Sequence, residues 1–165
     1  MGGVAAATGV TIAVDASKLA HSDDAVTLLG HFLNLSEQAT GFPKDELEAT
    51  GQATLYFAVA KDALGKNLFT SVLQTYGADG LEATLASPKF GPIVRNLIKL
   101  WYTATWERLP DDWRASYGFI PNDTTFIVSA TAYTTGLLWA TIGSNPPGAN
   151  APGYATWSNP PSRTP

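Results

Sequence analysis

Apolar residues recur at steps of three and four positions between residues 22 and 40, which is the period of one face of an α-helix. Ser22 is typical of a helix N-cap, and the two aspartates after it favour the positive end of the helix dipole. Gly41 and the nearby Pro43 are typical of a helix stop. We therefore expect an amphipathic helix over residues 22–40. The positions at this spacing, which give the helix one apolar face, are Val26, Leu29, Phe32, Leu33 and Ser36.

A second helix is expected from Lys44 to Ala63, because acidic residues crowd its first turn and apolar residues continue at helical spacing. Gly51 falls inside this stretch and weakens it by about 1 kcal/mol relative to alanine. Close packing of Gly51 against another helix would compensate for that cost. Gly65 is expected to separate this helix from the next one.

The helical period continues over the following forty or so residues, which include a short helical turn expected over residues 81–86. A third helix is expected to end at Gly77, with a turn that runs on to Gly80. The next helix would begin at Ser87 or, if the second proline of this region occupies its first turn, nearer Gly91. In both cases we expect it to end near Trp106.

The character of the chain changes after this helix. Asp111 and Asp112 are expected to start a short helix that runs through Tyr117, after which a glycine and a proline break the chain. Residues 124–133 are rich in β-branched side chains and are expected to be extended.

These elements predict a mainly α fold, a small helical bundle over residues 21–122 followed by a long, Pro/Gly-rich, largely extended tail over residues 123–165. Arg163 is the only charged residue from Thr124 onward, and six of the 11 prolines lie from residue 146 onward. Disordered tails are usually charged and poor in aromatic residues, whereas this one is aromatic and nearly uncharged. We expect it to lie either on the chain's own helices or on a partner surface, and we favour the partner because interface centres favour aromatic residues and deplete charge.

The aromatic residues of this tail are its expected anchors on the partner. They are Tyr133, Trp139, Tyr154 and Trp157. Trp101 and Tyr102, on the preceding helix, would either support the tail from beneath or join the same interface. Truncation after Asn122 is then expected to leave the helices folded and to abolish the complex.

The N-terminal segment contains an uncharged run of small and β-branched residues from Val4 to Val14. This run is shorter than the ~20 residues that a membrane helix needs, so no membrane span is expected. Two interpretations stay open for residues 1–20: the remnant of a secretory leader, or a disordered or buried N-terminal segment.

Composition narrows the chemistry that this chain can perform. Charged residues make up only 15% of its 165 residues, and the net charge of −4 argues against a nucleic-acid-binding surface. The absence of cysteine excludes disulfides, thiolate metal sites, iron–sulfur ligation and a cysteine nucleophile. His21 and His31 are ten residues apart, which is not the spacing of a helical metal pair. We expect no catalytic residue, cofactor site or metal site in this chain.

Two other functions are weighed against that expectation. An enzyme would have to use Asp111 or Asp112, but adjacent residues on a helix point in different directions and more often cap its first turn. A freestanding secreted saccharide-binding module would use exposed aromatic rings. The candidates for such stacking are Trp101, Tyr102, Trp106, Trp113 and Tyr117.

A series of short segments carries a family resemblance over most of the chain, from about residue 28 to residue 161. The segments are FLNLS at residues 32–36 with Thr40-Gly41, Gly51, LIKLWY at residues 97–102, Tyr117-Gly118-Phe119 followed by residues 125–128, Asn145 to Gly148, and Trp157 with Pro160. This series resembles the small subunit of bacterial membrane-bound FAD-dependent sugar and polyol dehydrogenases, which include sorbitol, fructose and glucose dehydrogenases. Residues 134–144 and 149–152 stand as insertions relative to that pattern.

The resemblance implies a noncatalytic role beside other subunits. In such complexes a flavoprotein large subunit holds FAD and an iron–sulfur cluster and oxidises the sugar, and a membrane cytochrome c subunit passes the electrons to quinone. The small subunit helps export the large subunit through the twin-arginine route and helps it mature. The resemblance therefore implies a periplasmic protein that associates with the inner membrane through its partners.

Overall fold

The computed structural model describes residues 16–144, 146, 149–150 and 153–154. The helices are α1 (Ala16–Thr40), α2 (Lys44–Ala49), α3 (Ala53–Leu64), α4 (Lys66–Ala86), α5 (Gly91–Thr103), α6 (Asp111–Tyr117), α7 (Ala130–Thr134) and α8 (Leu137–Thr141). The strands are β1 (Thr105–Trp106), β2 (Phe126–Ile127), β3 (Ala149–Asn150) and β4 (Gly153–Tyr154). The prediction of a mainly α fold is confirmed.

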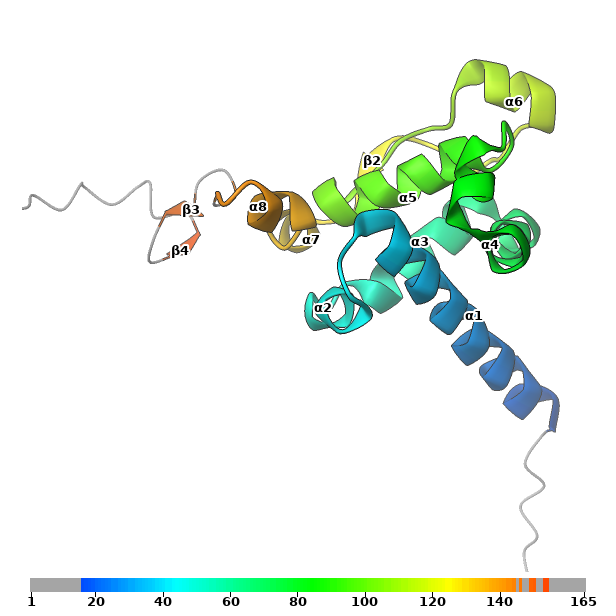
Figure 1. Ribbon diagram of the computed structural model, residues 1–165, viewed down its shortest axis with the longest axis horizontal. Helices are drawn as coiled ribbons and strands as arrows, with labels where there is room; N and C mark the ends of the chain where they lie inside the picture. The colour runs from blue at the N-terminus through cyan, green and yellow to red at the C-terminus, as the bar shows by residue number, and fades with distance from the viewer. Residues whose placement is uncertain (1–15, 145, 147–148, 151–152, 155–165) are drawn as a thin grey trace, which may run out of the picture.

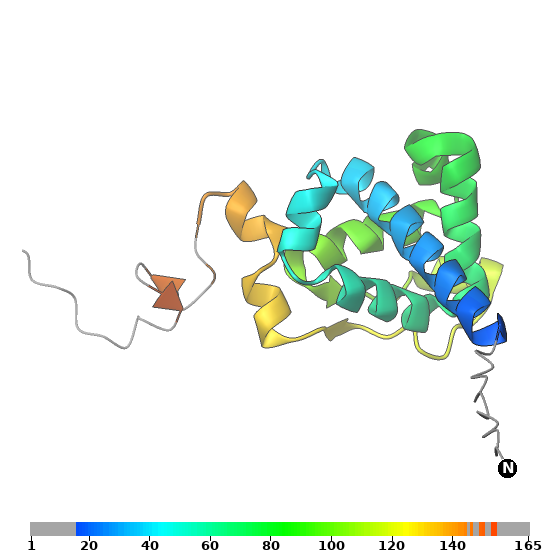
Figure 2. The ribbon, with the colours of Figure 1, turned by 90° about the horizontal axis from the view of Figure 1, so that it is seen from below.

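Four helices, α1, α3, α4 and α5, contact one another and enclose the core (Figure 1). Helix α5 has a strongly apolar face and lies among the others, while the first turns of α1 extend beyond them. Strands β1 and β2 form an antiparallel pair beside α5, with Thr105 opposite Ile127. Helices α7 and α8 lie at one end of the bundle, where α8 contacts α5 (Figure 2).

Aromatic side chains from three helices meet at the centre of the core. The Trp101 ring on α5 stacks on Phe32 of α1 with 6.2 Å between centroids, and meets Tyr56 of α3 edge-on at 4.9 Å. All three side chains are at most 1% exposed. The buried indole N–H of Trp101 donates to Ser36 Oγ at 2.9 Å, so burial leaves no polar atom of this ring without a partner.

The bounds of α1 differ from the prediction at one end. The helix begins at Ala16, so Ser22 lies inside it rather than at its N-cap. The residues before Ser22 include alanine, lysine and leucine, which favour helix and extend it past a local capping signal. The predicted end at Thr40 is confirmed, and Gly41 follows it with a φ of +78°.

The prediction of one helix that contains Gly51 is wrong, because residues 44–63 form two helices. Gly51 lies between α2 and α3 with a φ of +69°, and a Cβ placed there would meet nothing within 4 Å. It therefore supplies a left-handed turn and not a close helix contact. Gly65 separates α3 from α4 as predicted, again with a positive φ of +73°.

The predicted end of the third helix at Gly77 is also wrong. Helix α4 continues through Gly77 and kinks at Gly80, whose φ of +81° is non-helical. The next helix begins at Gly91, which is one of its two predicted starts. It ends at Thr103, because Ala104 is left-handed (φ 52°, ψ 29°) and turns the chain into β1, which contains Trp106.

Residues 123–144 pack on the bundle, so the folded domain extends beyond the expected boundary at residue 122. Phe126 and Ile127 are extended as predicted, but two short helices follow them. Asp123, Ala132 and Leu137 are at most 5% exposed. A truncation after Asn122 would therefore remove part of the core, which argues against the expectation that it leaves the helices folded.

Candidate functional site

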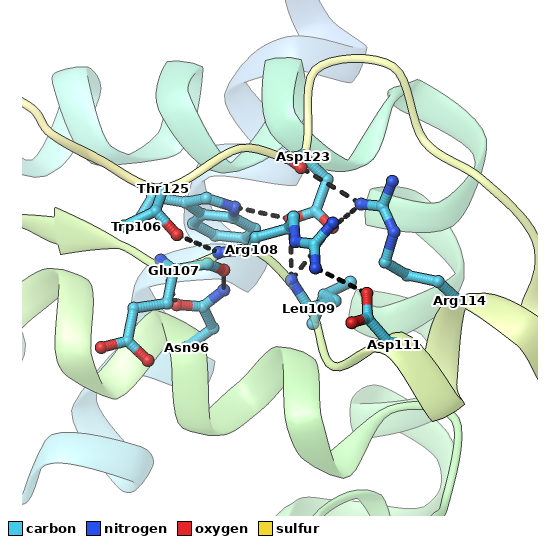
Figure 3. Close-up of polar contacts among 9 residues, drawn as sticks. All are labelled: Asn96, Trp106, Glu107, Arg108, Leu109, Asp111, Arg114, Asp123 and Thr125. Carbon is cyan, nitrogen blue, oxygen red and sulfur yellow. Dashed lines mark hydrogen bonds and ion pairs between the residues drawn. The ribbon is translucent and has the colours of Figure 1, made fainter.

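Asp123 is the centre of a buried polar network that positions the surface around α6 (Figure 3). Its side chain is 1% exposed. Oδ1 accepts hydrogen bonds from Trp106 Nε1 at 3.0 Å and from the Leu109 amide at 3.2 Å. Oδ2 accepts from the Leu109 amide at 3.0 Å and from Arg114 Nη1 at 2.9 Å. Both oxygens are thus occupied by the protein's own donors, and the carboxylate holds the fold together.

The loop between β1 and α6 is fixed from its other side by Asn96 of α5. The Asn96 amide bonds both backbone groups of Glu107, accepting from its N–H at 3.0 Å and donating to its carbonyl. The Arg108 amide donates to Thr125 Oγ1 at 3.0 Å (Figure 3). The loop therefore has a defined position between α5 and the segment that leads to β2.

The network extends to the surface through Arg114 on α6. The Arg114 guanidinium pairs with Asp123 and lies 4.9 Å from the ring centroid of Phe119, at cation–π distance. Gly118, with a φ of +106°, turns the chain out of α6, and Phe119 is 71% exposed. A large aromatic ring is thus held at the surface by a cation that is itself fixed by a buried carboxylate.

Beside this ring lies a hollow of about 560 Å³ between the first turn of α4 and α6, which we call the α6 groove. It is lined by Leu64, Gly65, Lys66, Asn67, Leu68, Ser71, Lys89, Trp113, Tyr117, Phe119, Ile120 and Pro121. Trp113 is 4% exposed, and its indole N–H donates to the Lys89 carbonyl at 2.7 Å. Its ring lies 5.3 Å from that of Tyr117. The buried Trp113 side chain, which lines the groove, therefore also fixes the backbone of Lys89.

A second hollow of about 450 Å³ continues from the α6 groove along α3. The two hollows share Gly65 and Lys66. The second is lined by Phe57, Ala58, Lys61, Asp62, Gly65, Lys66 and Asn122. Asn122 Nδ2 donates to Asp62 Oδ1 at 3.2 Å, which links the loop after α6 to the end of α3.

The predicted interface residues are placed as follows. Trp101 lies in the core, and Tyr102 is half-buried with its hydroxyl donating to the Thr40 carbonyl at 3.0 Å. Tyr133 and Trp139 are half-buried and meet edge-on at 5.3 Å. Trp139 Nε1 donates to the Tyr133 carbonyl at 2.7 Å, so these two residues form one unit at the end of the bundle.

The other two predicted anchors of the tail are Tyr154 and Trp157. Trp157 lies outside the described residues, and of Tyr154 only the backbone, in β4, is described. Strand β4 pairs with β3 in an antiparallel hairpin, with Ala149 opposite Tyr154.

The aromatic residues proposed for saccharide stacking are mostly internal. Trp101, Trp106 and Trp113 are at most 4% exposed, whereas Tyr117 is 43% exposed. Their helical spacing therefore reflects packing in the core.

The two candidate carboxylates of an enzyme have local partners. Asp111 pairs with Arg108 at 2.6 Å, and Asp112 Oδ1 accepts a hydrogen bond from the Trp113 amide at 2.9 Å. Both lie in the first turn of α6, where the helix dipole favours acidic residues. His31 is exposed on α1. Among the residues that the structure describes, no group of three or more His, Cys, Asp and Glu side chains could hold a metal ion.

Sequence reasoning did not single out Asp123 or Phe119. A signal for Asp123 was present, since it is the last acidic residue of the sequence and opens a stretch with almost no charge. A carboxylate in such surroundings is expected to be buried and paired. Phe119 has no comparable signal, because its exposure depends on how Gly118 turns the chain.

No family model, curated protein or solved structure matches this chain. Within the described part of the chain, no helix is long and apolar enough to cross a membrane.

Proposed function

We propose that this chain is the noncatalytic small subunit of a periplasmic FAD-dependent sugar or polyol dehydrogenase complex. It would aid the export, maturation and stability of the flavoprotein large subunit. FAD and an iron–sulfur cluster would belong to that partner, and a cytochrome c subunit would connect the complex to the inner membrane. The resemblance of the short segments described above supports the choice of family.

One structural observation carries the partner-binding role. Large hydrophobic side chains are exposed at six positions among the described residues, and four of them fall within residues 117–142. These four, which we call the C-terminal apolar residues, are Tyr117, Phe119, Ile127 and Ile142. The charge-depleted composition of this part of the chain matches the centres of protein interfaces.

The exposure of these residues also favours binding to a partner over burial in this chain's own core. Ile127 is 62% exposed on β2 and Ile142 is 57% exposed at the end of α8, although their neighbours Phe126 and Leu137 pack inward. Covering exposed apolar area stabilises an association at roughly 25 cal/mol per Å² before the costs of ordering. A partner that covers these residues would therefore bind more tightly than one that contacts polar residues alone.

The experiment is a pull-down of the tagged full chain from its native periplasm and membranes. The eluate is examined for flavin absorbance and for dye-linked oxidation of sugars and polyols. A yellow, active large subunit in the eluate is the expected result. A colourless chain that elutes alone would contradict the proposal.

Surface variants connect this result to the C-terminal apolar residues. Ile127→Ser with Ile142→Ser should reduce the amount of co-purified flavoprotein. Val26→Ser with Leu55→Ser removes two other exposed apolar side chains, which are 69% and 41% exposed, and should leave it unchanged. Saccharide-dependent quenching of tryptophan fluorescence in the isolated chain would instead favour the saccharide-binding module.

A further inference from the structure

The α6 groove is positively charged although the chain as a whole carries a net charge of −4. Its only charged lining residues are Lys66 and Lys89, and the adjoining hollow adds Lys61. The ion pairs between described residues are Lys99–Glu107, Arg108–Asp111 and Arg114–Asp123. Lys61, Lys66 and Lys89 belong to none of them, although the ammonium groups of Lys61 and Lys89 lie over the rings of Phe57 and Phe90. The single acid of the adjoining hollow, Asp62, accepts a hydrogen bond from Asn122.

Apolar surface accompanies these cations. Phe119 and Tyr117 stand exposed at the groove, and Leu68 and Ile120 line it. Aromatic residues that lie in a pocket beside cations are typical of the positions that dominate binding energy in interfaces. The groove therefore offers both charge and apolar contact to one ligand.

The groove is held in shape before anything binds. Phe119 lies against Arg114, which is fixed by the buried carboxylate of Asp123. The carbonyl of Lys89 is fixed by the indole of Trp113. A preformed site loses less conformational entropy on binding, so its contacts contribute more fully to affinity.

Building on the proposed function, we infer that the α6 groove receives an acidic segment of the partner subunit in which carboxylates alternate with apolar side chains. The carboxylates would lie at Lys66 and Lys89, and an apolar side chain would lie against Phe119. The parts of this chain outside the structure do not supply such a segment. Residues 155–165 contain no acid, and residues 1–15 contain only Asp15.

The first test uses a defined probe and the full chain. A short fluorescein-labelled peptide in which Glu alternates with Leu and Ser is titrated, and binding is followed by fluorescence anisotropy. Matched peptides replace either every Glu by Gln or every Leu by Ser. The inference expects the first peptide to bind and each matched peptide to bind more weakly, by roughly tenfold.

Charge variants localise this binding. Lys66→Glu with Lys89→Glu should weaken it by roughly tenfold or more, because two attractive contacts become repulsive. Lys44→Glu, at a lysine outside the ion pairs given above, reverses one charge away from the groove and should leave it unchanged, whereas Lys66→Glu alone should weaken it. Lys66 and Lys44 both lie in the first turn of a helix, where Glu is favourable, so both variants should keep their far-ultraviolet circular dichroism.

Other outcomes overturn the inference. They are an absence of peptide binding, equal binding of the Gln peptide, and equal binding by the Lys66→Glu and Lys44→Glu variants. Self-association that depends on Lys66 and Lys89 would assign the groove to a second copy of the chain instead. Saccharide binding abolished by Phe119→Ala would assign it to a sugar.

A crosslinking experiment distinguishes a failure of this inference from a failure of the proposed function. A photo-crosslinking side chain is placed at Asn67, which is exposed in the α6 groove, or at Glu82, which is exposed on α4 away from it. In the purified complex, the inference expects crosslinks from position 67 to an acidic segment of the flavoprotein. A flavoprotein that co-purifies but crosslinks to neither position, or to position 82 alone, overturns the inference and leaves the proposed function standing. If no flavoprotein co-purifies, the proposed function fails and the peptide titration decides whether the groove binds acidic segments.

Discussion

The indole N–H of Trp106 donates to Oδ1 of Asp123 at 3.0 Å, with both side chains at most 1% exposed. This bond joins β1 to the segment that precedes β2, and the same carboxylate pairs with Arg114 on α6. One buried acid therefore fixes the strand pair, the loop after it and the helix that borders the α6 groove.

Removal of this carboxylate should strongly destabilise the domain. Asp123→Ala leaves the Trp106 indole, the Leu109 amide and the Arg114 guanidinium without their acceptor, and breaking a buried charge pair costs about 3–5 kcal/mol. Asp111→Ala is the matched control, since its side chain is 79% exposed and its ion pair contributes less than about 1 kcal/mol. Urea unfolding followed by tryptophan fluorescence measures both. Equal losses in the two variants would contradict the role assigned to Asp123.

Truncation should separate the folded domain from the rest of the tail. A chain that ends after Ser144 keeps every buried residue described here and should melt cooperatively. A chain that ends after Asn122 lacks Asp123, Ala132 and Leu137 and should lose cooperative melting. Circular dichroism on heating measures the difference. A shorter chain that melts at the same temperature as the longer one would show that residues 123–144 contribute nothing to the core.

Substitution of alanine for each of two glycines should change the free energy of unfolding in opposite directions. Gly51→Ala forces a side chain into a φ of +69° and should lower the free energy of unfolding by about 1–2 kcal/mol. Gly77 is helical and exposed with no atom near its Cβ position, so Gly77→Ala should raise that free energy by about 0.4–1 kcal/mol. Urea unfolding gives both signs, and the same sign for both would contradict the conformational explanation.

Gly136 should not tolerate a side chain, for a steric reason. A Cβ at this position would lie 2.5 Å from the Tyr102 carbonyl oxygen, a backbone atom that cannot rotate away. Gly136→Ala should therefore shift α8 from α5 and cost about 1–3 kcal/mol. Hydrogen exchange of the Ile142 amide, which donates to the Leu138 carbonyl, should become faster. Gly30→Ala, at a helical position with nothing within 4 Å, is the control that should leave this exchange unchanged.

Alkaline pH should weaken the fold through Tyr56. Burial raises the pKa of Tyr56 from 10.0 to about 12, because the phenolate would be poorly solvated in the core. The raised pKa means that the folded state favours the neutral phenol, so this stability is fully present below pH 10 and is lost as pH rises from 10 to 12. Tyr56→Phe cannot ionise and should lose less stability over that range. Urea unfolding at pH 8 and at pH values between 10 and 12 compares the two proteins, and parallel curves would contradict the prediction.

Local sequence signals located the helices as far as α6 but not all of their bounds, and they did not predict α7 and α8. Gly41 and Pro43 predicted the end of α1 at Thr40, and the glycine at residue 65 marked the boundary before α4. The same period could not show that Gly51 interrupts a helix or that Gly77 does not. Both answers depend on backbone torsion angles, which tertiary packing sets and residue type only biases.

The residues of the candidate site were harder to predict than the fold. Trp101 and Phe119 are both aromatic residues in or beside a helix, yet one is 1% exposed and the other 71%. Their difference arises from contacts between segments far apart in the sequence, such as Trp101 with Ser36. Asp123 likewise acquires its role from partners that lie nine to 17 residues away. Periodicity along the chain carries no information about such pairs.

The contribution of residues 123–137 to the core also has a consequence for biosynthesis. While the polypeptide is still being made, α1, α3, α4 and α5 emerge before the acid that fixes β1 and before Ala132 and Leu137, which close the core. Until those residues are made, the earlier helices expose apolar surface. The domain can complete its fold only after Leu137 has been synthesised. A nascent chain of this kind exposes apolar surface to chaperones for most of its translation.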